Sequence, residues 1–242
     1  MQVPNFPECS HPLITSLFHY SDQDLLTLFQ RQPESGQYFT AIFCRYSALV
    51  YSLIQHSVRS PVQAEYLFAT TWRHMYHELG GLDLRAVAQQ AVSDPNASTR
   101  KMTLQSWIIN ITALCINRSE LPPVESIHYS LQHASPPLWC YVEQALEQLD
   151  PTQRLVVLMS YTFHWSETRI AAYLQAEGEQ LSISEIKHHL AEGYQQLQQL
   201  LPDDIREIYL GDRPLRPSEA EDPLDLEQDM DALFSPPSFE QP

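Results

Sequence analysis

The stretch from Leu138 to Leu201 most constrains the fold, because its apolar residues recur with helical spacing between residues that start or end helices. Val142, Leu146 and Leu149 fall at positions i, i+4 and i+7 and predict an amphipathic helix. Pro151 ends this helix because proline has no amide hydrogen for the next helical hydrogen bond. The nearly continuous apolar run that follows predicts a second helix, buried on most sides.

Capping residues predict two more helices in this stretch. Ser166 is placed to cap a short third helix, and Ser182 with Glu185 makes the capping box of a fourth. Pro202 marks the end of that fourth helix. A short helix, a turn and a longer helix in this order predict a helix-turn-helix inside a four-helix domain.

The first half of the chain also has helical periodicity. Ser21 starts a capped helix, and the aromatic and aliphatic residues of 38–54 predict a long helix with an apolar face. Ser60 precedes a proline that opens another helix, and residues 104–114 predict one more buried helix. These segments predict a helical domain, because alternation of the β type is hard to find.

The predicted fold is therefore all-α, with two small helical domains joined by a linker and followed by a disordered acidic tail. The expected order is a lead-in at 1–20, an N-terminal domain at 21–118, a proline-containing linker at 119–137, a four-helix domain at 138–202 and a proline-rich tail at 203–242. The chain of 242 residues is long enough for each domain to bury its own core.

The net charge of −16 is unevenly distributed. Residues 202–242 carry 3 basic and 12 acidic side chains, and residues 138–201 carry 3 and 8. An acidic helix-turn-helix region is unusual for a DNA reader, since Lys and Arg normally neutralise phosphates. The acidic tail has two interpretations: a solubilising disordered segment, or a segment that docks on a partner or covers a DNA-binding surface.

Cysteine spacing and hydropathy indicate in which cellular compartment the protein lies. Cys9, Cys44, Cys115 and Cys140 follow no metal-ligand spacing, and we expect all four to be reduced. No apolar run reaches the roughly 18 to 20 residues that span a bilayer, and residues 1–10 lack the parts of a signal peptide. We therefore expect a cytoplasmic protein without membrane contact.

Catalytic motifs are absent from the sequence. It contains no glycine-rich phosphate loop, no nucleophile elbow and no H-E-x-x-H pattern. The expectation is a protein that is not an enzyme and that holds no cofactor and no metal.

Several short motifs match a known family. They are Ala145-Leu146, Leu149-Asp150-Pro151, Val156-Val157-Leu158, Ser166-Glu167 and Ile183-Ser184-Glu185-Ile186-Lys187 in the second half, and the run from Phe39 to Tyr46, Ala64-Glu65 and Trp107-Ile108 in the first half. In this order they resemble the two domains of sigma-70 family RNA polymerase sigma factors, particularly the short extracytoplasmic-function type. The resemblance implies a transcription initiation protein with two partners, core RNA polymerase and promoter DNA. An anti-sigma factor or another regulatory protein is a further candidate partner.

The resemblance also implies candidate site residues. The last helix would enter the major groove, with candidates Ser184, Lys187, His188 and Gln195, while Arg154, Arg169, Arg100 and Lys101 are candidates for phosphate contact. The candidates for polymerase contact are Glu65, Tyr66, Ala69 and Arg73. Lys187, His188, Gln195, Arg154 and Arg169 could equally be ordinary surface residues, and Arg100 and Lys101 could lie in an ordinary solvated loop.

Departures from the family pattern support a second hypothesis. Tyr66 and Ala69 stand where the family usually has polar or acidic residues, and Lys187 is the one Lys or Arg of the last predicted helix. The turn before that helix is also longer than usual. The alternative is a degenerate sigma-like module that has kept the helical scaffold, has lost promoter recognition and acts through protein contacts.

Overall fold

The computed structural model describes residues 4–84, 103–132 and 134–211, and every regular element in these ranges is a helix. The predicted all-α fold is confirmed for this part of the chain. The described residues form two compact units, the first comprising residues 4–150 and 195–211 and the second comprising Pro151–Tyr194.

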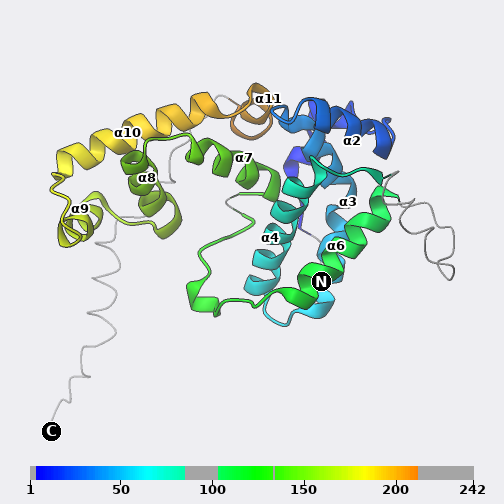
Figure 1. Ribbon diagram of the computed structural model, residues 1–242, viewed down its shortest axis with the longest axis horizontal. Helices are drawn as coiled ribbons and strands as arrows, with labels where there is room; N and C mark the ends of the chain where they lie inside the picture. The colour runs from blue at the N-terminus through cyan, green and yellow to red at the C-terminus, as the bar shows by residue number, and fades with distance from the viewer. Residues whose placement is uncertain (1–3, 85–102, 133, 212–242) are drawn as a thin grey trace, which may run out of the picture. The chain divides into compact units, whose positions relative to one another are not determined.

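The first unit is built around three long helices that lie side by side (Figure 1). They are α3 (Gly36–Ser57), α4 (Pro61–Leu79) and α6 (Leu104–Arg118). Around them lie η1 (Pro7–Ser10), α1 (Pro12–Thr15), α2 (Asp22–Arg31), η2 (Val124–Ser126), α7 (Pro136–Glu147), α11 (Asp203–Ile205) and η3 (Arg206–Leu210). The predicted helix starts at Ser21 and Ser60 are confirmed, because both side chains accept a hydrogen bond from the first turn.

The second unit contains α8 (Pro151–Phe163), α9 (Glu167–Ala176) and most of α10 (Ile183–Leu200). Its core consists of Val156, Met159, Ile170, Leu174 and Ile186, with Trp165, Ala171, Leu181 and Leu190 packed against them. These residues come from all three helices. The helical spacing predicted from the sequence therefore does bring one apolar face of each helix together.

Aromatic side chains of α3 and α4 make the centre of the first unit. The rings of Phe43 and Trp72 are 5.0 Å apart, those of Phe39 and Tyr76 are 4.8 Å apart, and both pairs meet edge to face. Phe39, Phe43 and Trp72 are completely buried. Edge-to-face pairs contribute beyond the area they bury, so this cluster fixes how α3 crosses α4.

The first residues of the chain belong to this packed unit and are not a separate lead-in. Phe6 is buried and its ring lies 4.8 Å from that of Phe43, while Ile14 of α1 is fully buried. Cys9 in η1 forms a disulfide with Cys44 in α3. The prediction that all cysteines are reduced is wrong for these two, because a spacing of 35 residues gives no hint that η1 folds back onto α3. Cys115 and Cys140 are free thiols.

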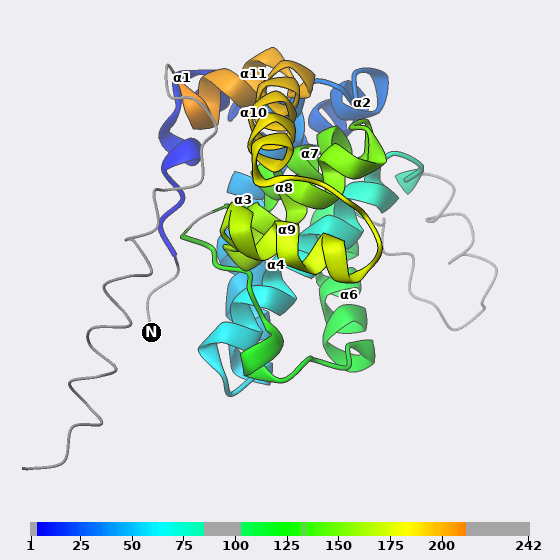
Figure 2. The same ribbon diagram turned by 90° about the vertical axis from the view of Figure 1, so that its left-hand side faces the viewer.

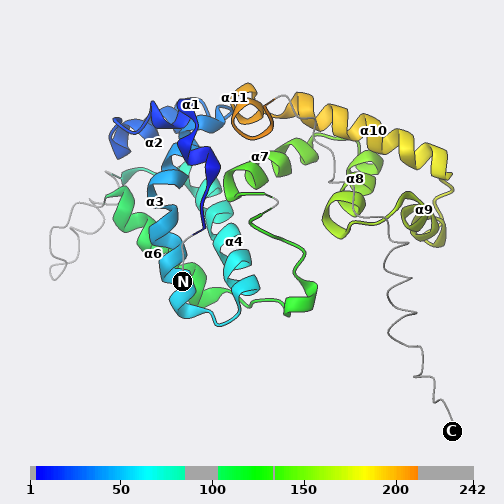
Figure 3. The same ribbon diagram turned by 180° about the vertical axis from the view of Figure 1, so that it is seen from behind.

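Residues 203–210 differ from the prediction of a disordered tail. They form α11 and η3, and α11 lies beside α1 (Figures 2 and 3). Ile205 is fully buried against Gly36, where a Cβ atom added to the glycine would lie 2.1 Å from the Ile205 Cγ1 atom. Only a glycine at position 36 allows this approach. Residues 212–242, the rest of the expected tail, lie outside the described residues.

Asp204 supplies the N-terminal cap of α3. Its Oδ2 atom accepts hydrogen bonds from the Ser35 hydroxyl at 2.8 Å and the Gln37 amide at 2.9 Å, and its Oδ1 atom accepts one from the Gly36 amide at 3.1 Å. Ser35 itself makes no side-chain cap. A carboxylate at a helix start satisfies free amides and interacts favourably with the helix dipole. The cap of α3 therefore comes from a segment that lies more than 160 residues further along the chain.

A buried carboxyl group lies close by. Glu8 of η1 is 4% exposed, and burial raises the pKa of its carboxyl above the ordinary value of 4.5. The Tyr209 hydroxyl of η3 donates to Glu8 Oε1 at 3.4 Å. Burial, followed by the proximity of Glu8, raises the pKa of Tyr209. The first and last described segments thus meet at one partly polar contact.

We predict that Asp204→Ala lowers the free energy of unfolding by about 1 to 2 kcal/mol, because the first turn of α3 loses its cap. Urea unfolding followed by circular dichroism measures this. Asp203→Ala is the matched control, since Asp203 is 93% exposed and pairs only with Arg206 among the described residues. Its effect should stay within about 0.5 kcal/mol. Equal effects of the two substitutions would contradict the capping role of Asp204.

Candidate nucleic-acid interface

The helix α10 begins at a capping box, as predicted. The Ser182 amide and hydroxyl both donate to Glu185 Oε2 at 2.7 Å, and the Glu185 amide donates to Ser182 Oγ at 3.3 Å. The hydrogen bonds from the Ser182 backbone and hydroxyl lower the pKa of Glu185 below its ordinary value. The carboxylate at this position is therefore held in the ionised form at the start of the helix.

Three candidate residues lie together on the first turns of α10. Ser184, Lys187 and His188 are all exposed and occupy positions i, i+3 and i+4, so they share one face of the helix. Gln195 is also exposed, two turns further on. Ile186 between them points the other way, since it is completely buried in the core of the second unit. The face that carries Lys187 is thus turned to solvent.

A close approach of two helices holds α10 against α8. A side-chain carbon added to Gly193 would lie 2.6 Å from Val157 Cγ2, so Val157 or the helices must shift to accept a larger residue at this crossing. Tyr194 and Gln153 add polar contacts between the same helices. The Tyr194 hydroxyl donates to Ser160 Oγ at 3.4 Å, and Gln153 Nε2 donates to Glu192 Oε2 at 3.2 Å.

The extended turn between α9 and α10 has a defined conformation. Gly178 adopts φ +94°, a value that favours glycine, and the Glu179 amide donates to the Leu174 carbonyl at 2.9 Å. These features end α9 in the usual way for a helix followed by glycine. The added residues lengthen the turn without disturbing the two helices that it joins.

The two candidate arginines of the second unit have different surroundings. Arg169 is exposed on α9, and its guanidinium lies over the Trp165 ring at 4.4 Å from the centroid. This cation–π contact orients the charge while leaving its N–H groups available for hydrogen bonds. Arg154 is half-buried on α8. Arg100 and Lys101, the other predicted phosphate contacts, lie outside the described residues.

Comparison with protein families matches residues 141–197 to the family described as Sigma-70, region 4. Residues 141–197 of the chain therefore form a sigma-70 region 4 domain. The matched segment runs from α7 to α10 and therefore includes the helix-turn-helix. The match supports a sigma-factor-like DNA-binding role for this segment. No curated protein and no solved structure matches the chain.

The electrostatics of the region 4 helix-turn-helix are less favourable to DNA than its geometry. On α10 the carboxylates of Glu185 and Glu192 accompany Lys187. Glu192 Oε1 lies 3.3 Å from His188 Nε2, and its other oxygen accepts from Gln153. The Glu192 charge is therefore partly engaged by neighbours on the same unit. Lys187 and Arg169 are the exposed cations of the described α8–α10 segment.

The four candidate polymerase contacts lie on α4 in the first unit, outside the matched segment. Ala69 is completely buried, and Tyr66 is half-buried. Glu65 Oε2 accepts a hydrogen bond from the Leu131 amide of the linker at 3.4 Å. Arg73 forms an ion pair with Glu143 of α7 at 2.7 Å, and its guanidinium lies 5.7 Å from the centroid of the Trp139 ring. Two of the four side chains thus already have partners inside the first unit.

The linker is bound to the first unit along part of its length. Gln63 Nε2 donates to the Pro122 carbonyl at 2.8 Å, and the Leu131 amide donates to Glu65 Oε2 at 3.4 Å. The sequence predicts only a proline-containing linker here. Its contacts were missed because most of them use backbone amides and carbonyls, which every sequence offers alike.

Within the described ranges, no helix combines the length and the apolar character needed to cross a membrane. The same ranges contain no group of three or more side chains suited to hold a metal ion.

We predict that Gly193→Ala destabilises the region 4 helices by about 1 to 3 kcal/mol, because α8 and α10 must move apart to accommodate one carbon atom. Thermal unfolding followed by circular dichroism measures the effect. Gly81→Ala is the control, since nothing lies within 4 Å of an added carbon there. A Gly193→Ala protein as stable as the Gly81→Ala protein would contradict the close crossing.

Proposed function

We propose that this protein is a transcription initiation factor of the short two-domain, extracytoplasmic-function type of sigma factor. It binds core RNA polymerase and recognises an upstream promoter element through α10. The observation that carries the proposal is the solvent-facing set of Ser184, Lys187 and His188 on the second helix of a region 4 helix-turn-helix. Side chains near the start of a recognition helix reach base edges in the major groove.

The remaining candidates have separate roles in this proposal. Lys187 offers a cationic donor to guanine or to phosphate, and Ser184 can bond to either. Arg169, oriented by Trp165, contacts a backbone phosphate beside the groove. Arg154 of α8 and Gln195 of α10 are further candidates for contact with DNA. The helix-turn-helix has few cations, so its affinity for DNA depends more on each of them than in a strongly basic DNA-binding domain.

We predict that Lys187→Gln weakens binding to promoter DNA about tenfold and reduces the salt dependence by about one phosphate contact. Fluorescence anisotropy with labelled DNA at several salt concentrations measures both quantities. Arg31→Gln is the charge-matched control, because Arg31 is exposed at the end of α2 in the first unit. The proposal fails if the two variants bind DNA equally well.

A second candidate function is favoured by the charge of the region 4 segment. Lys187 stands between two carboxylates on α10, and the predicted four-helix segment is acidic as a whole. In this case the chain is a sigma-like regulatory module that acts through protein contacts without reading a promoter. DNA affinity that is weak and unaffected by Lys187→Gln would favour it.

Polymerase binding is tested by co-elution of the full chain with core RNA polymerase. We predict co-elution, and we predict that Arg73→Gln weakens it about tenfold, since arginine is often an energetically dominant residue of interfaces. Glu143→Gln is the matched control, because it breaks the same internal ion pair and leaves Arg73 in place. Loss of binding with both variants, or with neither, would contradict a direct contact between Arg73 and the polymerase.

A further inference from the structure

The disulfide and the docked segment 203–210 share one face of α3. Gly36, Thr40 and Cys44 occupy positions i, i+4 and i+8 of the helix, so these three positions lie in a single row along one face. Ile205 packs at Gly36, and Cys9 of η1 is bonded at Cys44. Thr40 lies between them and turns its hydroxyl to the Gly36 carbonyl at 2.9 Å. The chain's first and last described segments therefore pack against neighbouring positions of one helix.

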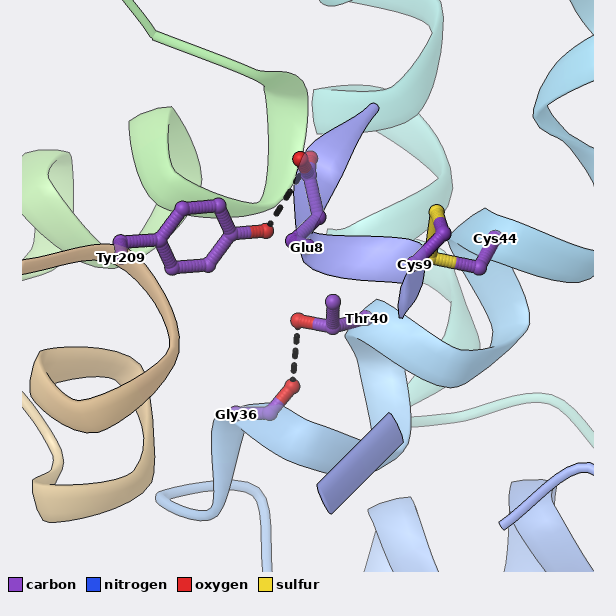
Figure 4. Close-up of a disulfide and its surroundings, with 6 residues drawn as sticks. All are labelled: Glu8, Cys9, Gly36, Thr40, Cys44 and Tyr209. Carbon is purple, nitrogen blue, oxygen red and sulfur yellow. Dashed lines mark hydrogen bonds between the residues drawn. A yellow bond between two sulfur atoms is a disulfide. The ribbon is translucent and has the colours of Figure 1, made fainter. Parts of the chain in front are cut away.

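Glu8 connects the two segments directly. It is adjacent to Cys9 in η1, and it accepts the hydrogen bond of Tyr209 in η3. Figure 4 shows the Tyr209 ring and the disulfide on either side of Glu8. The position of Glu8 depends on how η1 is held on α3, and Cys9–Cys44 is the covalent part of that attachment.

We propose that the Cys9–Cys44 disulfide is a redox-sensitive latch that controls the docking of residues 203–210 on the first unit. In the oxidised chain η1 is fixed, and Glu8 holds Tyr209. In the reduced chain η1 is less constrained, the Glu8–Tyr209 contact loosens, and the segment 203–210 is released more often. This inference goes beyond the proposed function and does not depend on it.

The chemistry of the latch is thiol–disulfide exchange with a dithiol reductant. The Cys9 Sγ–Cys44 Sγ bond breaks and the two sulfurs become thiols, while the dithiol gives up two electrons and two protons and closes to its own disulfide. Both cysteines are partly exposed, so a small thiolate reaches them. Cys140 is buried, and burial raises the pKa of its thiol, so it is a poor exchange partner.

The sequence predicts a cytoplasmic protein. In a reducing cytoplasm, thiol–disulfide exchange opens the Cys9–Cys44 disulfide. Disulfides of cytosolic proteins are mostly transient, and many report the redox state. Residues 203–210 follow α10 after a single turn, and α10 ends the segment matched to region 4.

Hydrogen exchange of the full chain, measured with and without dithiothreitol, tests the latch. We expect the amides of residues 203–210 to exchange about tenfold faster after reduction. Loss of the Tyr209–Glu8 hydrogen bond, once η1 is less firmly attached to α3, favours local opening of this segment. The amides of α6 serve as the internal reference and should not change. Unchanged exchange at 203–210, or an equal increase in α6, would overturn the proposal.

Variants separate the latch from other effects of the reductant. Replacing Cys9 and Cys44 together by alanine should give the fast exchange in both conditions, whereas replacing Cys115 and Cys140 by alanine should leave the response to dithiothreitol intact. Tyr209→Phe keeps the ring and removes the hydroxyl, so the oxidised variant should already exchange faster and respond less to reduction. A full response to dithiothreitol in Tyr209→Phe would show that the Glu8–Tyr209 contact does not couple the disulfide to residues 203–210. This result would overturn the proposal.

Discussion

The capping of α3 by Asp204 is the interaction on which the arrangement of the first unit depends. α3 contributes Phe39 and Phe43 to the aromatic core, and the same helix carries Cys44 of the disulfide. Its first amides have no cap from Ser35 and are satisfied by a carboxylate that follows α10. Buried or half-buried amides without partners are expensive, so the helix and the segment 203–210 stabilise each other. The first unit is complete only when η1 and the segment 203–210 are both in place.

Much of the secondary structure could be predicted because its signals are local. Ser21, Ser60, Ser166 and Ser182 each precede a helix and cap it, since a short side-chain oxygen can reach the amides two or three residues ahead. Apolar spacing likewise identified the buried faces of α3, α4 and α10. These properties are set within one or two turns, and the sequence contains all that decides them.

Long-range pairings could not be predicted in the same way. Nothing near Cys9 indicates Cys44 as its partner, and nothing near Asp204 indicates the start of α3. One signal was present for the docked segment: Leu201, Ile205 and Tyr209 continue the apolar stripe of α10 at steps of four beyond Pro202. The acidic composition of the tail concealed it. For the candidate site, exposure of Lys187 followed from the buried position of Ile186, whereas the stacking of Arg169 on Trp165 required knowledge of how α9 is oriented.

The internal partners of Glu65 and Arg73 have a consequence for any protein that binds to α4. The linker and α7 are covalently joined to the surface they cover, so they compete with a partner at a high effective concentration. A partner that needs Arg73 binds only those molecules in which Glu143 and Trp139 have moved away. If about 1% of molecules are in that state, the apparent affinity is about 100-fold weaker than the intrinsic one. Substitutions in α7 that never touch the partner would then tighten its binding.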